Sequence, residues 1–358
     1  MTQNPLFSAI LLTYNRPAFL KKSVESLQRQ THSNIEIILI NNGGTQETLD
    51  FLRDVAASDN RIVVVNFEEN QFSWDDPGIV IDVCWNAGLA KATGEYVWIQ
   101  NDDDILADDY AEKMVALFQN NSECTTAAGL PVSMGDDGQV NPVELSENNV
   151  RSRYTPGYEL ALDQIFGTRT MFSAPGTIFT IKRDVLLEAG GYHKAIEDSH
   201  LYGIVPFGVT GFDPRALFYW RNHKAQLNKQ LSSKGWIGTD DSLDLLKEWD
   251  LEERWSVFGA DVSRRFVRSY KNRVHDSAAR WFVITLYSFR LSAAIRIMLN
   301  ECSTTNFWTR VVAHAVARQN IANAVGLMIK PPLKGLFRIL PGLAKLTPRL
   351  SAKVDRWN

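Results

Sequence analysis

Short runs of apolar residues, many of them β-branched, alternate with amphipathic segments through the first hundred positions of the chain. The apolar runs predict buried strands, and the amphipathic segments predict helices with one apolar face. The expected strands are residues 7–12, 35–40, 62–65 and 96–99, and the expected helices are 18–30, 46–57 and 80–92. This βαβ order predicts an α/β fold, with a mostly parallel sheet flanked by helices.

Polar segments follow three of the expected strands: Thr13 to Arg16, Asn41 to Gly44 and Gln100 to Asp104. The carboxyl ends of parallel strands meet at one edge of a sheet, where ligands bind in this class of fold. We therefore expect these segments to form one site. Beyond them, residues 133–153 are rich in turn-forming residues and predict a loop, strand pairing resumes near 176–181, and the chain becomes helical and basic from about residue 253.

The 358 residues are 45% hydrophobic and 22% charged, which is the range of ordinary globular proteins with one large domain or two. Cys84, Cys124 and Cys302 lie far apart and show no paired spacing, so we expect neither a disulfide framework nor a zinc site. The first residues lack the basic start and apolar core of a signal peptide. These features favour a cytoplasmic protein.

The net charge of −3 hides two oppositely charged parts. Residues 1–253 contain 37 acidic and 20 basic side chains, which gives −17, whereas residues 254–358 contain 4 acidic and 18 basic ones, which gives +14. A strongly basic part favours contact with an anionic surface, either a membrane or a nucleic acid. We therefore expect residues 1–253, with halves of about 1–130 and 131–253, to form one domain and 254–358 a basic helical region.

Three successive carboxylates, Asp102, Asp103 and Asp104, follow the fourth expected strand. Like charges in one place resist simultaneous ionisation unless a cation neutralises them. Oxygen ligands favour Mg²⁺ or Mn²⁺, and Mg²⁺ typically binds through one or two carboxylates and substrate phosphates. The alternative is an acidic turn that precedes and stabilises a helix. The triplet alone leaves both readings open.

Four stretches together resemble the inverting glycosyltransferases of family two, which have the GT-A, Rossmann-like fold. The stretches are residues 7–16 (FSAILLTYNR), 35–45 (IEIILINNGGT), 86–104 with Asn86-Ala87-Gly88, Thr93-Gly94-Glu95-Tyr96 and Asn101 to Asp104, and 189–198 with Gly190-Gly191-Tyr192 and Glu197-Asp198. The resemblance covers residues 7 to 223. It implies sugar transfer from a nucleotide diphosphate donor to a glycan or lipid-linked acceptor, in bacterial surface polysaccharide or glycolipid synthesis.

The resemblance also implies roles for individual residues. Asp198 corresponds to the general base that takes the proton of the acceptor hydroxyl, and Asp103 to the main carboxylate contact of an Mn²⁺ or Mg²⁺ ion, with Asp104 and His223 as further metal contacts. Glu197 and Arg221 fall near the acceptor or the diphosphate. The expected donor-binding residues are Thr13, Tyr14, Asn15, Arg16, Asn41, Asn86 and Asp102.

Three positions depart from the family pattern. Asn41 stands where relatives commonly have an Asp that contacts the nucleotide base, Trp85 where they often have Arg, and Asn101 replaces the first Asp of the DXD motif. Asn carries no charge and Trp cannot pair with a phosphate, so we expect the donor base and the metal geometry to differ from the usual pattern. These losses of acids leave a catalytically impaired binding protein as an alternative.

The basic region contains an amphipathic stretch with Arg264, Arg265, Arg268, Lys271 and Arg273. The uncharged run 281–289 is far too short to span a bilayer, and residues 330–340 mix cations with bulky apolar side chains, as interfacial segments do. We expect this region to dock on the cytoplasmic face of an anionic membrane; a helical subdomain or an interface between copies of the chain is the alternative.

Two other classes of protein fit less well. A nucleic-acid-binding protein would use the basic region for phosphate contacts, but no nucleic-acid-binding motif accompanies it and the acidic part would repel a polyanion, so no nucleic acid is expected as a partner. A nucleotidyltransferase would normally have a glycine-rich turn after the first strand, where this chain has Thr13 to Arg16.

Overall fold

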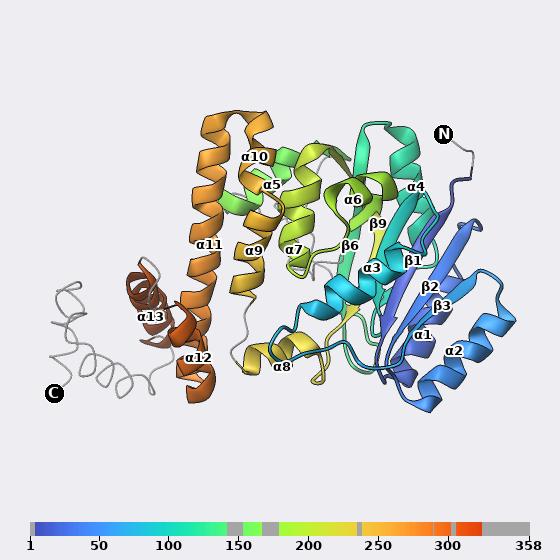
Figure 1. Ribbon diagram of the computed structural model, residues 1–358, viewed down its shortest axis with the longest axis horizontal. Helices are drawn as coiled ribbons and strands as arrows, with labels where there is room; N and C mark the ends of the chain where they lie inside the picture. Colours follow the sequence, from blue (N-terminus) through green and yellow to red (C-terminus); the bar gives the residue numbers. More distant parts are fainter. Residues whose placement is uncertain are drawn as a thin grey trace. The chain divides into compact units, whose positions relative to one another are not determined.

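The computed structural model describes residues 4–141, 153–166, 179–234, 238–288, 290–301 and 306–323 (Figure 1). The chain divides into two compact units. Unit 1 consists of Met1–Lys224 and Asp244–Val267, and unit 2 of Ala225–Leu243 and Arg268–Asn358. Unit 1 carries the sheet, whereas the described part of unit 2 is helical.

Unit 1 is built on a nine-stranded sheet, counted over the described residues. The strands are β1 Phe7–Thr13, β2 Ile35–Asn42, β3 Ile62–Phe67, β4 Tyr96–Asn101, β5 Ile105–Leu106, β6 Cys124–Met134, β7 Tyr154–Pro156, β8 Phe179–Lys182 and β9 Val209–Arg221. Their order is β3-β2-β1-β4-β8-β6-β9-β5, and β7 pairs with β9. The long pairings β1–β2, β1–β4, β2–β3 and β6–β9 are parallel, and most paired residues belong to them. The expected α/β fold with a mostly parallel sheet is confirmed.

Eight α-helices lie wholly within the described part of unit 1, several of them against the sheet (Figure 1). They are α1 Pro17–Gln28, α2 Gln46–Ser58, α3 Asn86–Leu89, α4 Tyr110–Asn120, α5 Gly157–Phe166, α6 Arg183–Ala189, α7 Ile196–Asp198 and α10 Leu251–Trp255, with short π or 3₁₀ turns η1 Ile81–Trp85, η2 Ser199–Ile204, η3 Val205–Phe207 and η4 Ser256–Phe258. Along β1, Phe7, Ala9 and Leu11 join the cluster under α1 and α4, whereas Ile10 joins the cluster under η1 and α3. This alternation is the period of two that a strand buried on both faces requires.

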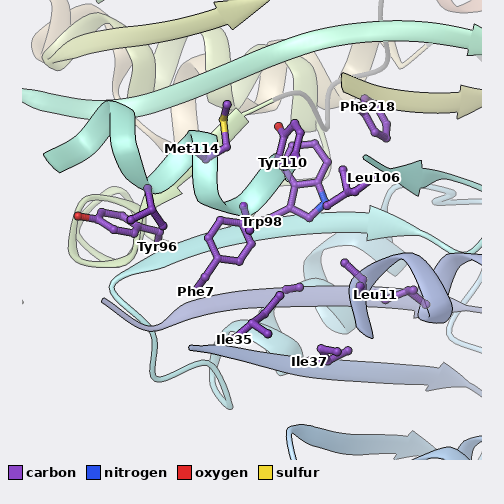
Figure 2. Packing of buried hydrophobic residues seen from close by; sticks show 14 of the residues in the cluster. Phe7, Leu11, Ile35, Ile37, Tyr96, Trp98, Leu106, Tyr110, Met114 and Phe218 are labelled. Carbon is purple, nitrogen blue, oxygen red and sulfur yellow. The ribbon is translucent and has the colours of Figure 1, made fainter. Parts of the chain in front are cut away.

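Large aromatic side chains fill the core beneath α4 (Figure 2). The Trp98 ring centroid lies 4.8 Å from that of Tyr110 and 5.3 Å from that of Phe218. Burying one such side chain stabilises the fold by about 1.5–3 kcal/mol. The cluster therefore holds β4, α4 and β9 together, and β4 and β9 are the two strands that end at the site described below.

Two stretches that carried the family resemblance turn out to fix the packing of the sheet. A Cβ on Gly88 would lie 2.5 Å from a methyl carbon of Ile10 and 2.7 Å from one of Ile40, so only glycine lets this helix approach β1 and β2 so closely. At the start of β4, the Glu36 carboxylate accepts hydrogen bonds from the backbone nitrogens of Thr93 (2.6 Å) and Gly94 (2.8 Å). These contacts set the position from which β4 runs toward the acidic triplet.

The predicted strands of the first hundred residues are all present, as are the helices predicted at 18–30 and 46–57. The helix predicted at 80–92 differs, because it begins as the π-helical turn η1 and ends at Leu89. The loop predicted at 133–153 is partly a strand, since β6 continues to Met134 before a turn in which Gly135 N donates to Gln139 O (2.8 Å). Residues 142–152 of that loop and 176–178 lie outside the described residues; the expected pairing after them is present as β8.

The described helices of the C-terminal part are α8 Leu227–Ser233, α9 Thr239–Glu248, α11 Ala260–Tyr287, α12 Leu291–Glu301 and α13 Phe307–Asn323. Within unit 2, Phe282, Ile297 and Phe307 form part of a core cluster that joins α11, α12 and α13. None of the helices in the described ranges is long and apolar enough to cross a membrane. The segment 330–340, expected to be interfacial, lies outside the described residues.

Candidate active site

The acidic triplet lies in the turn between β4 and β5, where Asp104 N donates to Asn101 O (3.2 Å). All three side chains are almost completely buried. The three carboxylates have different hydrogen-bond partners, described in turn below, although Arg16 contacts both Asp102 and Asp103. The triplet is therefore a set of buried, individually held acids rather than a solvated acidic turn.

Asp102 is fully buried and connects the end of β4 to the end of β1. Its Oδ2 accepts hydrogen bonds from Thr13 Oγ1 (2.7 Å) and Tyr14 N (3.2 Å). Its Oδ1 lies 2.5 Å from Arg16 Nη2, with which it forms an ion pair. Burial raises the pKa of Asp102 to about 6, although Arg16 opposes that shift. Asp102 thus holds the first polar turn against the triplet.

Asp103 faces His223 and Arg16, which are 207 positions apart in the chain. Asp103 Oδ2 lies 2.8 Å from His223 Nε2 and 2.9 Å from Arg16 Nη1, and the two nitrogens are 3.3 Å apart. Asp103 Oδ1 takes part in no hydrogen bond within the described part of the chain. The structure therefore brings an acid, an imidazole and a guanidinium into one contact. The topology predicted that Arg16 and Asp103 would lie at one edge, whereas His223 was expected there from the family resemblance.

Asp104 supports the end of β9. Its Oδ1 accepts from Arg221 N (3.0 Å) and its Oδ2 from Asn101 Nδ2 (3.4 Å). Burial, followed by the neighbouring Asp103, raises the pKa of Asp104 well above its usual range. With both oxygens directed at the chain, Asp104 has less freedom than Asp103 to bind a metal, and its predicted metal contact stays a prediction.

Arg221 is buried at the end of β9, where its side chain ties the acidic turn to the turn after β6. Its Nε donates to Asp103 O (3.0 Å), and its Nη1 donates to Gly135 O and Asp136 O (both 3.1 Å). These backbone contacts give Arg221 a positioning role in this arrangement. Its expected position near the acceptor or diphosphate stays a prediction.

Phe19 is a contact of the site that the sequence patterns did not single out. Its ring centroid lies 5.1 Å from that of His223, and the Arg221 Cζ lies 4.8 Å from the Phe19 centroid. Such contacts restrict an imidazole and a guanidinium without hydrogen bonds. Phe19 follows Arg16 by three positions at the start of α1, a helical spacing that would have indicated a shared face.

The ends of β1, β2 and β3 form a polar ladder beside the acidic turn. Asn41 Oδ1 accepts from Gly44 N (3.0 Å), and Asn41 Nδ2 donates to Asn66 Oδ1 (2.7 Å). Asn15, in the left-handed region at φ 53°, accepts from Thr45 N through Oδ1 (2.6 Å). Asn tolerates this conformation better than most residues. Tyr14, which follows β1, is 43% exposed and is the most accessible of the expected donor-binding residues.

The segment with the expected base is fixed by a glycine turn. Asn86 accepts from Tyr192 N and donates to Tyr192 O, both at 2.8 Å, and a Cβ on Gly191 would lie 2.4 Å from Asn86 Oδ1. Gly191 also has a left-handed φ of 89°, which favours glycine. Asn86 thus uses its amide to hold this turn, and its donor-binding role stays a prediction.

Asp198 ends α7, the short helix that follows this turn, and the next residues form the π-helical turn η2. Asp198 is buried whereas Glu197 is exposed. Trp85, which stands where relatives often have Arg, is buried and packs edge-on against Tyr192 with centroids 5.7 Å apart. This position therefore belongs to the core that supports the turn.

A divalent metal is implied by the acidic motif, and the residues present can be tested against it. Within the described ranges, no three His, Cys, Asp or Glu side chains are arranged to hold a metal ion by themselves. Asp103 and His223 nevertheless offer a hard oxygen and an imidazole side by side. Mg²⁺ commonly binds through one or two carboxylates, with water and substrate phosphates as the other ligands. Such an open site fits these two residues.

Comparison with known proteins identifies the family. Residues 8–188 match the family described as Glycosyl transferase family 2, and the chain belongs to that family. An uncharacterized glycosyltransferase of Haemophilus influenzae is 32% identical over 125 residues, 35% of this chain and 36% of that protein. The putative teichuronic acid biosynthesis glycosyltransferase TuaG of Bacillus subtilis is 31% identical over 134 residues, 37% of this chain and 50% of that protein. The matched segments thus span about a third to a half of these relatives.

A solved structure shows the same fold. Residues 1–349 of S. aureus TarS, crystallised in complex with UDP-GlcNAc, superpose with a TM-score of 0.54 at 15% identity, covering 88% of this chain and 92% of that chain. At this identity the similarity concerns the fold alone. The expected GT-A fold is confirmed.

Proposed function

We propose that the chain is an inverting glycosyltransferase that moves a sugar from a nucleotide diphosphate donor to an acceptor hydroxyl. The observation that carries the proposal is the contact of Asp103 with His223 and Arg16, at the edge where β1, β4 and β9 end. Membership of family 2 supports the same activity. The cations and the polar ladder of this edge suit an anionic diphosphate joined to a nucleoside.

In this proposal, Asp103 and His223 hold Mn²⁺ or Mg²⁺. The bound ion would supply positive charge for the diphosphate as it leaves with the bonding electrons of the sugar. The chain's own part is to keep Asp103 and His223 in place. Arg221 does this through Asp103 O, and Phe19 through its contact with the His223 ring.

Asp198 acts as the general base in this proposal. The acceptor oxygen forms a bond to the anomeric carbon on the face opposite the diphosphate, the bond from that carbon to the phosphate oxygen breaks, and the acceptor proton passes to the Asp198 carboxylate. Attack from the opposite face inverts the anomeric configuration. The support is the family pattern of residues 189–198, together with the rigid turn that Asn86 and Gly191 impose before α7.

Asn41 and Asn66 are proposed to lie at the base-binding end of the donor site. They occupy paired positions of β2 and β3, and their amides are uncharged hydrogen-bonding groups. TarS was crystallised in complex with UDP-GlcNAc, and TuaG is named as a putative glycosyltransferase of teichuronic acid biosynthesis. For this chain we propose a nucleotide sugar of the same general kind and a bacterial surface glycan or glycolipid as acceptor.

A panel of nucleotide sugars would test the activity. We expect at least one donor to release its nucleoside diphosphate faster in the presence of acceptor, with this release dependent on Mn²⁺ or Mg²⁺ and abolished by a chelator. The stereochemistry of the product, read by NMR coupling constants at the anomeric carbon, should be inverted. Retention of configuration, or equal turnover in excess chelator, would refute the mechanism.

We further propose that unit 2 docks on an anionic membrane through α12. Leu291, Ile295 and Leu299 recur at a helical spacing of four and are 59%, 52% and 67% exposed, while Ile297 on the same helix is buried. Arg290 and Arg296, next to this stripe, are exposed. The acids described in α11 and α12 within unit 2 are engaged, Asp276 by Arg310 and Glu301 by His275. An apolar stripe with neighbouring cations suits the interface of an anionic bilayer.

Sedimentation with vesicles tests this surface. We expect the full chain to sediment with vesicles that contain phosphatidylglycerol and not with purely zwitterionic ones. Serine at positions 291, 295 and 299 together should reduce the bound fraction at least about fivefold, because three insertions of apolar side chains are lost. Val257→Ser is the matched control, because Val257 is an aliphatic residue of η4 in unit 1 that is 72% exposed. Vesicle binding by the triple variant equal to that of the wild type would contradict the proposal. So would a variant that loses a dimer of the chain and keeps its vesicle binding.

A further inference from the structure

We propose that Arg16 is a built-in counter-cation that competes with the divalent metal for the Asp103 carboxylate. This inference rests on the proposed metal site. Arg16 reaches two acids of the triplet at once, through Nη2 to Asp102 Oδ1 (2.5 Å) and through Nη1 to Asp103 Oδ2 (2.9 Å). The same Nη1 lies 3.3 Å from His223 Nε2. One guanidinium nitrogen therefore touches both Asp103 Oδ2 and His223 Nε2, which face each other at the proposed metal site.

The electrostatic setting makes a cation at this point necessary. A guanidinium is always charged in proteins, and Arg16 places this charge against the carboxylates of Asp102 and Asp103. Arg221, the other arginine that contacts this turn, directs its side chain to the backbone oxygens of Asp103, Gly135 and Asp136. Arg16 thus carries the charge compensation of the carboxylates before a metal arrives.

Metal binding to Asp103 Oδ2 and His223 Nε2 requires Arg16 Nη1 to leave both atoms, because two cations this close repel each other strongly in a partly buried site. The Nη2 contact with Asp102 can remain, since it involves a different carboxylate. Nη1 of the Arg16 guanidinium would then be available beside the metal to donate to a diphosphate oxygen. Arg16 consequently lowers the affinity of the site for a metal ion in the absence of donor. When the donor is bound, its negative charge favours metal binding.

A graded series of variants tests this competition by metal affinity rather than by turnover. Binding of Mn²⁺ alone is measured by the loss of the free-ion electron paramagnetic resonance signal. Arg16→Gln removes the charge and should raise the Mn²⁺ affinity about tenfold or more, because the competing ion pair is gone. Arg16→Lys keeps a charge but cannot bridge two carboxylates as a planar fork does, so its affinity should lie between those of wild type and Arg16→Gln. Arg29→Gln changes an arginine on an exposed ion pair with Asp108 and should leave the affinity unchanged.

Thermal unfolding gives a second readout. Without metal, Arg16→Gln should unfold at a lower temperature than wild type, because buried acids lose their cation; saturating Mn²⁺ should raise its melting temperature by more than it raises that of wild type. A merely structural role for Arg16 would instead weaken Mn²⁺ binding in both variants, and this outcome overturns the inference. If donor turnover requires metal but the Arg16 variants bind Mn²⁺ with the same affinity as the wild type, the inference fails and the proposed function stands. If neither the wild type nor Arg16→Gln binds Mn²⁺, the proposed metal site itself is refuted.

Discussion

Asp103→Asn is expected to lower kcat for sugar transfer by about a thousandfold and to abolish saturable Mn²⁺ binding at concentrations that saturate the wild type. The change removes the one carboxylate of the triplet that faces both His223 and Arg16 and has an oxygen with no hydrogen-bond partner in the described chain. It keeps the volume of the side chain, so the core beneath the turn should remain packed. Initial rates of nucleoside diphosphate release and the Mn²⁺ resonance titration measure the two effects.

Asp108→Asn is the matched control for this prediction, because Asp108 lies five positions later and its exposed side chain pairs only at the surface with Arg29. Its kcat should stay within about twofold of wild type, since an exposed ion pair contributes little. Asp104→Asn provides an internal contrast: it disturbs the Arg221 backbone contact but should still bind Mn²⁺. Wild-type metal affinity in Asp103→Asn would remove Asp103 from the metal site.

The strand pattern allowed the gathering of polar segments at one edge to be predicted, because parallel strands all deliver their carboxyl ends to the same side. Thr13 and Asn41 occupy paired positions of β1 and β2, and Leu12 pairs with Asn101 of β4. Apolar runs specify strands buried on both faces, and the helices between them specify parallel connections. The pattern of apolar runs was therefore sufficient to predict that Thr13, Asn41 and Asp102 lie at one edge of the sheet.

The different contact partners of the three acids in the triplet could not be predicted from local sequence. Three consecutive acids predict shared metal binding, yet their partners come from distant positions: Thr13 for Asp102 and Arg221 for Asp104. Arg221 reaches the turn only because β9 pairs with β5, with Ile105 opposite Tyr219, and β9 shifts register against β6 between Ala128 and Leu130. A register shift of this kind leaves little trace in a pattern of apolar residues.

The glycines of the family stretches have physical reasons that the sequence pattern does not reveal. Gly88 permits close approach of a helix to the sheet, Gly94 leaves room for Ser8, whose Oγ would lie 2.4 Å from an added Cβ, and Gly191 leaves room for Asn86. The amide of Asn86, whose donor-binding role stays a prediction, also holds the turn before α7. Part of the family pattern therefore reports packing, and only part reports chemistry.

Asp198→Asn is expected to lower kcat by about a thousandfold, within the range of removing a general base, while the KM for the donor stays within about twofold. The amide cannot take the acceptor proton, but it has the size and much of the hydrogen-bonding capacity of the buried carboxylate, so the end of α7 should keep its conformation. Donor binding involves the edge formed by β1, β2 and β4 and does not require Asp198 in our proposal. Steady-state kinetics with donor and acceptor varied separately measure this split.

Glu188→Gln is the matched control, because Glu188 is an exposed acid at the end of α6, ten positions before Asp198. Its rate should equal that of wild type, and Mn²⁺ affinity should be unchanged in both variants, which separates loss of the base from loss of the metal. A parallel fall in donor affinity, metal affinity and kcat would show that Asp198 maintains the site's structure. Full activity of Asp198→Asn would show that another group accepts the proton, with the exposed neighbour Glu197 as the first residue to replace.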